Sequence, residues 1–275
     1  MSWHRVFTVA RTDLRQLRQS RDFWGPMVAL GAIFFVVAPT ILLLTITSVG
    51  DIDAVSRVSE ALKVLPDTAQ QQIKGDSDAG RTSYALAVFL FAPVAVVVPL
   101  TISTAVGAAS IVGERERGTG EFLAHSPAEV SEIYLGKLVA SLLPGYLTVI
   151  VGFGIYSLIV NLIVGPEVGG WFFPTPEWWV LMFWVVPPFL GLTLSMVLRL
   201  SARVKSTAAA QQASGLVTLP LILIAYGQST GALFGTGTGS AWIVGAIAWA
   251  LAGWGLVRGA KTMSRARLLG VADEQ

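Results

Sequence analysis

The residue types that most often carry chemistry are scarce in this chain. It has no cysteine and two histidines, His4 and His125, which both fall outside its long apolar stretches. A buried haem would need histidines within such stretches, and an intramembrane protease would need a serine–histidine pair or paired aspartates there. Without cysteine there are no thiolate zinc sites, iron–sulfur clusters or disulfides. We therefore expect no catalytic, metal-binding or cofactor-binding residue.

The densest group of charges lies in a loop at residues 113–137. Residues 114–117 read Glu-Arg-Glu-Arg, and these charges could pair with one another or with those of a partner protein. Gly118 and Gly120 allow the chain to turn sharply. Residues 126–129, Ser-Pro-Ala-Glu, form a capping-box pattern with proline at the first helical position. The loop therefore predicts a turn, a short helix, a break and a new helix that starts at Ser126.

Long apolar stretches flank this loop. Hydrophobic residues make up 53% of the chain and charged residues 13%, which is about half the charged share of a soluble domain. About 20 helical residues cross the hydrocarbon core of a membrane. The sequence predicts an all-α integral membrane protein with six spans, at about 25–48, 84–112, 138–164, 178–198, 208–228 and 241–257. Pro93 and Pro99 predict a kink in the second span, where a neighbouring helix would satisfy the freed carbonyls.

Lysine and arginine are distributed unevenly along the chain. With the N-terminus inside, fifteen of the nineteen lie in inner segments and four in the outer loop 49–83. This asymmetry predicts that both termini are cytoplasmic, together with residues 1–24, the loop 113–137 and the tail 259–275. We expect the chain to lie in the plasma membrane.

The outer loops carry weaker patterns. In the first outer loop, Val55–Val64 could form a short helix. The loop as a whole could be a solvated connection or an element that captures substrate. Trp171, Trp178 and Trp179 are typical of the interfacial aromatic belt, and a ligand site is the alternative there.

Residues 3–18 have the pattern of an amphipathic helix. Spacings of three and four residues place one set of side chains on an apolar face, formed by Trp3, Val6, Phe7, Ala10, Leu14 and Leu17. The same spacing places three arginines on the opposite face, namely Arg11, Arg15 and Arg18. We expect this helix to lie in the inner membrane interface, with lipid as its partner. A topology anchor and a mechanical element are both compatible with the pattern.

Taken together, these features resemble the ABC-2 family of transporter permeases. After its second span that family has acidic and basic residues, Gly-Thr, an acidic residue, paired apolar residues, a proline, and Gly-Lys opening the third span. The matching residues are Glu114, Glu116, Gly118, Thr119, Glu121, Phe122, Leu123, Pro127, Gly136 and Lys137. Phe122 departs from the pattern, because leucine is usual there, and His125-Ser126 precede the proline.

The resemblance implies the permease subunit of an ATP-driven ABC transporter, and an exporter in particular. ATP and Mg²⁺ would be bound by a separate P-loop ATPase subunit, and a second permease copy or a related permease would complete a homo- or heterodimer. A coupling helix in the loop would dock on the ATPase. The implied coupling residues are Glu114, Arg115, Glu116, Arg117, Gly118, Thr119, Glu121, Phe122, Leu123 and Pro127.

Two other functions are compatible with the composition. One is a membrane scaffold that transports nothing, and the other is a secondary transporter, which the lack of ionisable residues in the six stretches disfavours. Neither requires the Gly-Thr-x-Glu loop. Residues 255–262 have the wrong glycine–lysine spacing for an ATP-binding loop. With a net charge of only +2 and basic residues beside the spans, nucleic-acid binding has no support.

Overall fold

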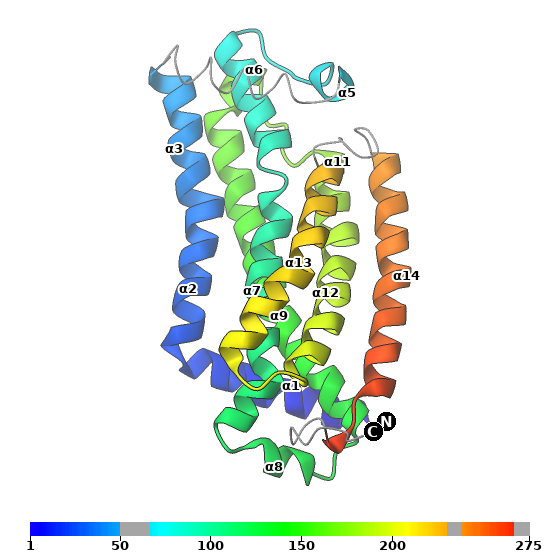
Figure 1. Cartoon of the computed structure of the whole chain (residues 1–275). Coiled ribbons are helices and arrows are strands. Elements are labelled where there is room, and N and C mark those ends of the chain that lie inside the picture. The colour runs from blue at the N-terminus through cyan, green and yellow to red at the C-terminus, as the bar shows by residue number, and fades with distance from the viewer. Residues whose placement is uncertain (50–66, 230–237, 267–275) are drawn as a thin grey trace.

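A computed structural model describes residues 1–49, 67–229 and 238–266, and the expected helix at Val55–Val64 falls outside this part of the chain. Within the described ranges, the regular elements are helices. Six helical segments there are long and apolar enough to cross a membrane: Arg21–Thr47, Asp78–Glu116, Val130–Ile163, Pro176–Ser201, Thr207–Ile224 and Thr238–Thr262. They form one bundle (Figure 1), so the prediction of an all-α protein with six spans is confirmed.

Three spans are single helices, and three are built from consecutive pieces joined by short π-helical turns. The single helices are α9 (Val130–Ile163), α13 (Thr207–Ser229) and α14 (Thr238–Thr262). The composite spans are α2 (Arg21–Ala32) with α3 (Ala38–Leu44), α6 (Asp78–Ala85) with α7 (Val94–Glu116), and α11 (Pro176–Val180) with α12 (Val186–Ser201). The remaining helices are α1 (Trp3–Gln19), α5 (Asp67–Gln70), α8 (Gly120–Ala124) and α10 (Gly165–Val168).

The second span is interrupted at Pro93, one of the two prolines that predicted a kink, whereas α7 continues through Pro99. The helix breaks at Phe91–Pro93, because Pro93 has no N–H to donate. Two carbonyls just before the break accept hydrogen bonds from neighbouring elements. The Tyr156 hydroxyl of α9 donates to Ala87 O at 2.7 Å, and the Trp178 indole N–H of α11 donates to Val88 O at 2.9 Å. The predicted compensation by neighbouring helices is therefore present.

Trp178 corrects one expectation, because it does not belong to an interfacial belt. It is 2% exposed, whereas Trp171 and Trp179 are largely exposed. Trp178 stacks on Phe153 and Tyr156 in an aromatic cluster, and its position is fixed by the hydrogen bond to Val88. A buried tryptophan normally finds such a partner for its N–H.

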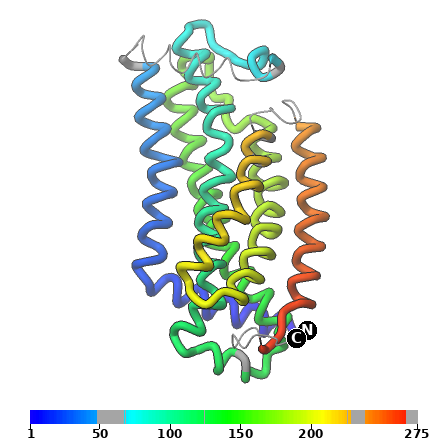
Figure 2. The backbone as a smooth tube through the Cα atoms, viewed as in Figure 1, coloured from blue at the N-terminus to red at the C-terminus, as the bar shows by residue number. Residues whose placement is uncertain are grey.

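The bundle is closed at one end by α1, which runs across the ends of the spans (Figure 2). α1, α8 and the end of α14 lie at this end, and α5 and α6 lie at the other (Figure 1).

α7 is buried along most of its length. It packs closely on α9 at Gly145, where an added Cβ would lie 2.5 Å from the Pro99 carbonyl oxygen. This close crossing holds α7 and α9 together within the membrane-spanning part of the bundle.

Candidate functional site

The loop between α7 and α9 has the predicted order of turn, short helix, break and long helix. α7 ends at Glu116, Gly118 adopts φ +72°, and α8 spans Gly120–Ala124. The start of the next helix corrects the prediction, because α9 begins at Val130 and not at Ser126. Its capping box is formed by Glu129 and Glu132, whose side chains each bond to the backbone N–H of the other residue. A glutamate at the N-cap position here replaces the expected serine.

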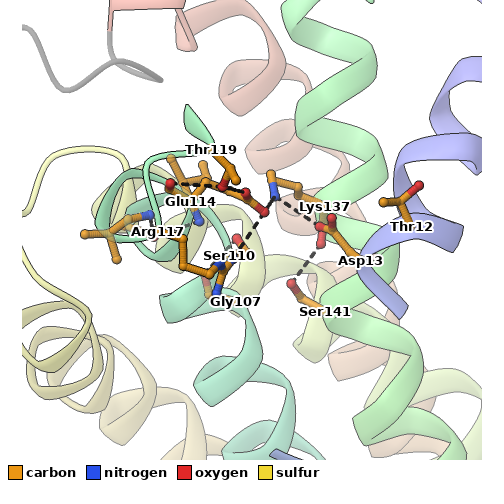
Figure 3. A network of polar contacts seen from close by, with 12 residues as sticks. Thr12, Asp13, Gly107, Ser110, Glu114, Arg117, Thr119, Lys137 and Ser141 are labelled. Atoms are coloured by element: carbon orange, nitrogen blue, oxygen red, sulfur yellow. Dashed lines mark hydrogen bonds and ion pairs between the residues drawn. The ribbon is translucent and has the colours of Figure 1, made fainter. Parts of the chain in front are cut away.

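An ion cluster at the start of this loop joins three helices (Figure 3). The Lys137 ammonium of α9 lies 3.1 Å from Asp13 Oδ2 of α1 and 3.3 Å from Glu114 Oε1 of α7. Arg117 lies 3.3 Å from the same Glu114 oxygen, and the Thr119 hydroxyl donates to the Glu114 carboxylate. Lys137 is 1% exposed. A lysine so deeply buried is stable as a cation only with carboxylates this close.

Asp13 is the least compensated member of the cluster. Burial raises its pKa above the ordinary value, and this effect outweighs the opposing effect of Lys137. Glu114, by contrast, contacts Lys137, Arg117 and Thr119. The cluster therefore contains one carboxylate with several partners and one carboxylate that depends on Lys137.

Arg115 and Glu116 point to a different part of the bundle. The Arg115 guanidinium donates to the carbonyl oxygens of Ser201 and Val204, at 2.9 and 2.8 Å. The Glu116 carboxylate accepts from the N–H of Thr207 at 2.8 Å, and also from its hydroxyl. Both residues thus hold the turn between α12 and α13.

A second ionic contact fixes the beginning of α1 to the beginning of α9. Arg5 lies 3.5 Å from Glu132 and donates to the Pro127 carbonyl at 3.1 Å. Glu132 also accepts from the Ser2 backbone N–H. α1 is therefore attached to α9 at both Glu132 and Lys137.

The faces of α1 only partly follow the predicted pattern. Arg11, Arg15 and Arg18 are exposed, as a helix with a polar face requires. Within the apolar set, Val6 and Ala10 are buried against the bundle, whereas Trp3 and Phe7 are exposed and Leu14 and Leu17 are half-buried. The apolar residues thus divide between a face that packs on α9 and a face that is left open.

α8 leaves two of the predicted coupling residues exposed. Phe122 is 79% exposed, and Glu121 is also exposed. Leu123 is half-buried and packs on a small core with Ile111 and Ala128, which anchors α8 to the bundle. Arg117, Gly118, Thr119 and Pro127 are exposed as well, so the outer surface of the loop is formed by α8 and the turns around it.

Sequence reasoning missed the intramolecular partners of the loop. Asp13 could have been found, because it follows Val6 and Ala10 at helical spacing and so places a charge on the packed face of α1. Lys137 was noted as part of a motif, without a partner. Ser201 and Thr207 could not be found, since neither stands in a pattern that differs from an ordinary helix end.

Comparison with known protein families gives one match. A family model described as ABC-2 family transporter protein matches residues 7–246. The match includes most of α1, the first five spans and the start of α14, together with the loop that carries the charged cluster. No curated protein matches the chain.

Proposed function

Because the chain belongs to the ABC-2 transporter family and is a transmembrane component of an ABC transporter, we propose that it is an exporter permease of the plasma membrane, driven by a separate P-loop ATPase. That ATPase would bind ATP and Mg²⁺, and two permease copies or two related permeases would form the transport unit. α1 and α8 face the cytoplasm in this proposal. Fifteen of the nineteen lysines and arginines then lie on the cytoplasmic side, which favours this orientation.

The observation that carries the proposal is the exposure of Phe122 on α8. A phenylalanine that is 79% exposed on a short helix, at the end of a bundle, is a suitable anchor for a pocket on another protein. Large aromatic anchors often dominate the binding energy of protein interfaces. Glu121 precedes this anchor on α8 and adds an exposed charge that can fix its orientation.

The neighbouring residues supply a route for force from α8 into the spans. Glu114 connects the loop to α9 and α1 through Lys137, while Arg115 and Glu116 connect it to α12 and α13. In this proposal, a displacement of α8 by the ATPase moves the ends of these helices together. The charges of residues 114–116 then transmit movement within the permease, and the surface of α8 binds the ATPase.

Purification of the tagged chain from its native membrane in mild detergent tests the proposal. We expect a near-stoichiometric P-loop ATPase to co-purify, and Phe122→Asp to reduce its recovery by about tenfold or more. Lys205→Gln is the matched control, because Lys205 is exposed in the α12–α13 turn at the same end of the bundle. The control should retain the ATPase.

Two results would contradict the proposal in different ways. Full recovery of the ATPase with Phe122→Asp would remove α8 as the docking element. A stable preparation without any ATPase, repeated under crosslinking, would favour a scaffold that transports nothing.

A further inference from the structure

A half-open cavity of about 460 Å³ lies beside the ion cluster and is lined by residues of α1, the start of α2, α7 and α9. Its volume falls in the range of about 300–1,000 Å³ that is typical of small-molecule sites. One part of the wall is apolar and includes Leu17, Phe23 and Val106. Another part is charged and includes Asp13, Glu114 and Arg117. The cavity therefore suits a ligand with a polar head and an apolar body.

The ion pairs around the cavity determine which charge the head should carry. Both nearby cations are already engaged: Lys137 lies between two carboxylates, and Arg117 pairs with Glu114. Asp13 differs, because among the described residues Lys137 alone lies within ion-pair distance of it, and Lys137 is shared with Glu114. An anion entering the cavity would meet two carboxylates whose cations are committed, whereas a cation would add a partner to Asp13.

The ionisation of Asp13 supports the same choice. Burial raises the pKa of this carboxyl, which means that its negative charge is not fully compensated in the folded protein. A positive group within hydrogen-bond distance would stabilise the charge.

We infer that the cavity binds an amphiphile with a protonated amine, which pairs with Asp13 while its hydrocarbon part packs on Leu17, Phe23 and Val106. This inference rests on the proposed function and names the substrate class of the permease as hydrophobic organic amines. The position next to α1 fits such a ligand, because in the proposed orientation α1 lies at the cytoplasmic membrane interface and the ligand would reach the cavity from there.

Binding of an amine would also affect the charged loop. The amine shares the Asp13 carboxylate with Lys137, which weakens the Asp13–Lys137 ion pair and makes Lys137 depend more on Glu114. Glu114 directly precedes Arg115 and Glu116, the two residues that hold the α12–α13 turn. Occupancy of the cavity is thereby linked to the α12–α13 turn and to the loop that carries α8, the element proposed to bind the ATPase.

Radiolabelled dodecylamine tests this site on the purified full-length chain in phospholipid nanodiscs, with empty nanodiscs as the blank. We expect saturable binding that unlabelled dodecylamine displaces and that dodecanol and dodecanoate, which share its tail, do not. Asp13→Asn should weaken the affinity by about tenfold or more. Asp22→Asn, an exposed carboxyl on α2 outside the cavity wall, should bind as the wild type does.

A second variant separates loss of the site from loss of the fold. Gln16 is exposed and lines the cavity, so Gln16→Trp should narrow it and weaken binding without altering the core. Unchanged binding in both Asp13→Asn and Gln16→Trp would overturn the inference, as would equal displacement by dodecanol or dodecanoate. Co-purification of a phospholipid that Asp13→Asn releases would also overturn it, in favour of a structural lipid.

The binding assay needs no ATPase, so its result does not depend on whether the proposed function is correct. Amine binding without a co-purifying ATPase would support the site and contradict the permease proposal. An ATPase whose hydrolysis responds to no amine, together with absent amine binding, would leave the permease proposal in place and refute the substrate class.

Discussion

Arg115 and Glu116 are adjacent in sequence and hold opposite ends of the same turn. Arg115 donates to carbonyls where α12 ends, and Glu116 accepts from the Thr207 N–H where α13 begins. The C-terminus of a helix carries partial negative charge and the N-terminus partial positive charge. Each side chain therefore meets the helix end of opposite charge, and α7 is locked to two helices by two consecutive residues.

Replacing Arg115 should weaken the attachment of α7 to the α12–α13 turn. Arg115→Met keeps the aliphatic stem but removes the donors to Ser201 O and Val204 O, and should lower the free energy of unfolding by about 1–3 kcal/mol. Arg115→Lys should recover only part of the loss, because one ammonium lacks the forked geometry that reaches both carbonyls. Thermal unfolding in detergent measures both variants, and a wild-type transition for Arg115→Met would refute this role.

The buried lysine gives a second prediction. Lys137→Met leaves Asp13 and Glu114 facing each other without their shared cation, and should destabilise the protein by about 3–5 kcal/mol. The triple variant Asp13→Asn, Glu114→Gln, Lys137→Met removes all three charges and should recover most of that loss. If the triple variant is no more stable than Lys137→Met in chemical unfolding, the ion cluster does not explain the burial of Lys137.

The crossing of α7 and α9 is testable with two glycines of one helix. Gly145→Ala should strongly reduce stability, because its Cβ would lie 2.2 Å from Ser103 Oγ and 2.5 Å from Pro99 O. Gly154→Ala is the matched control, since nothing lies within 4 Å of its Cβ position. Alanine is favoured over glycine inside a helix, so Gly154→Ala should unfold at the wild-type temperature or above. Similar effects of the two substitutions would argue against the close crossing.

The stability of the protein should depend on pH through Asp13. The pKa of Asp13 is raised from 3.8 in the folded state. Between 3.8 and this raised pKa, the folded protein therefore binds more protons than the unfolded chain. The contribution of Asp13 to stability therefore falls as the pH rises from about 4 through its raised pKa, and levels off above it. Asp13→Asn should lack this decline, whereas Asp22→Asn should retain it. Parallel profiles of wild type and Asp13→Asn in unfolding experiments would contradict the assignment.

The spans and the loop order were predictable because they depend on local composition. Runs without charge indicated the six spans, and the break at Pro93 followed from the missing N–H of proline. The start of α9 was misplaced, because Ser126 and Glu129 formed a capping pattern that competed with the pair actually used, Glu129 and Glu132. Local patterns alone do not decide between two overlapping caps.

The partners of the charged loop were not predictable for a different reason. The contact between Arg115 and Ser201 joins residues 86 positions apart, and nothing in either local sequence specifies the other. Trp178 shows the same limit, because its neighbours Trp171 and Trp179 are exposed while it is buried. Only the packing of the spans determines which of these side chains turns inward.

The ion pair between Asp13 and Lys137 also sets an order of events during synthesis. Asp13 is made 124 residues before its partner, and two complete spans separate them. Until the third span has left the ribosome and entered the bilayer, α1 lacks both the cation that neutralises Asp13 and the surface on which Val6 and Ala10 pack. α1 therefore waits undocked through the early stages of insertion, and its attachment to α9 marks the completion of the first half of the bundle.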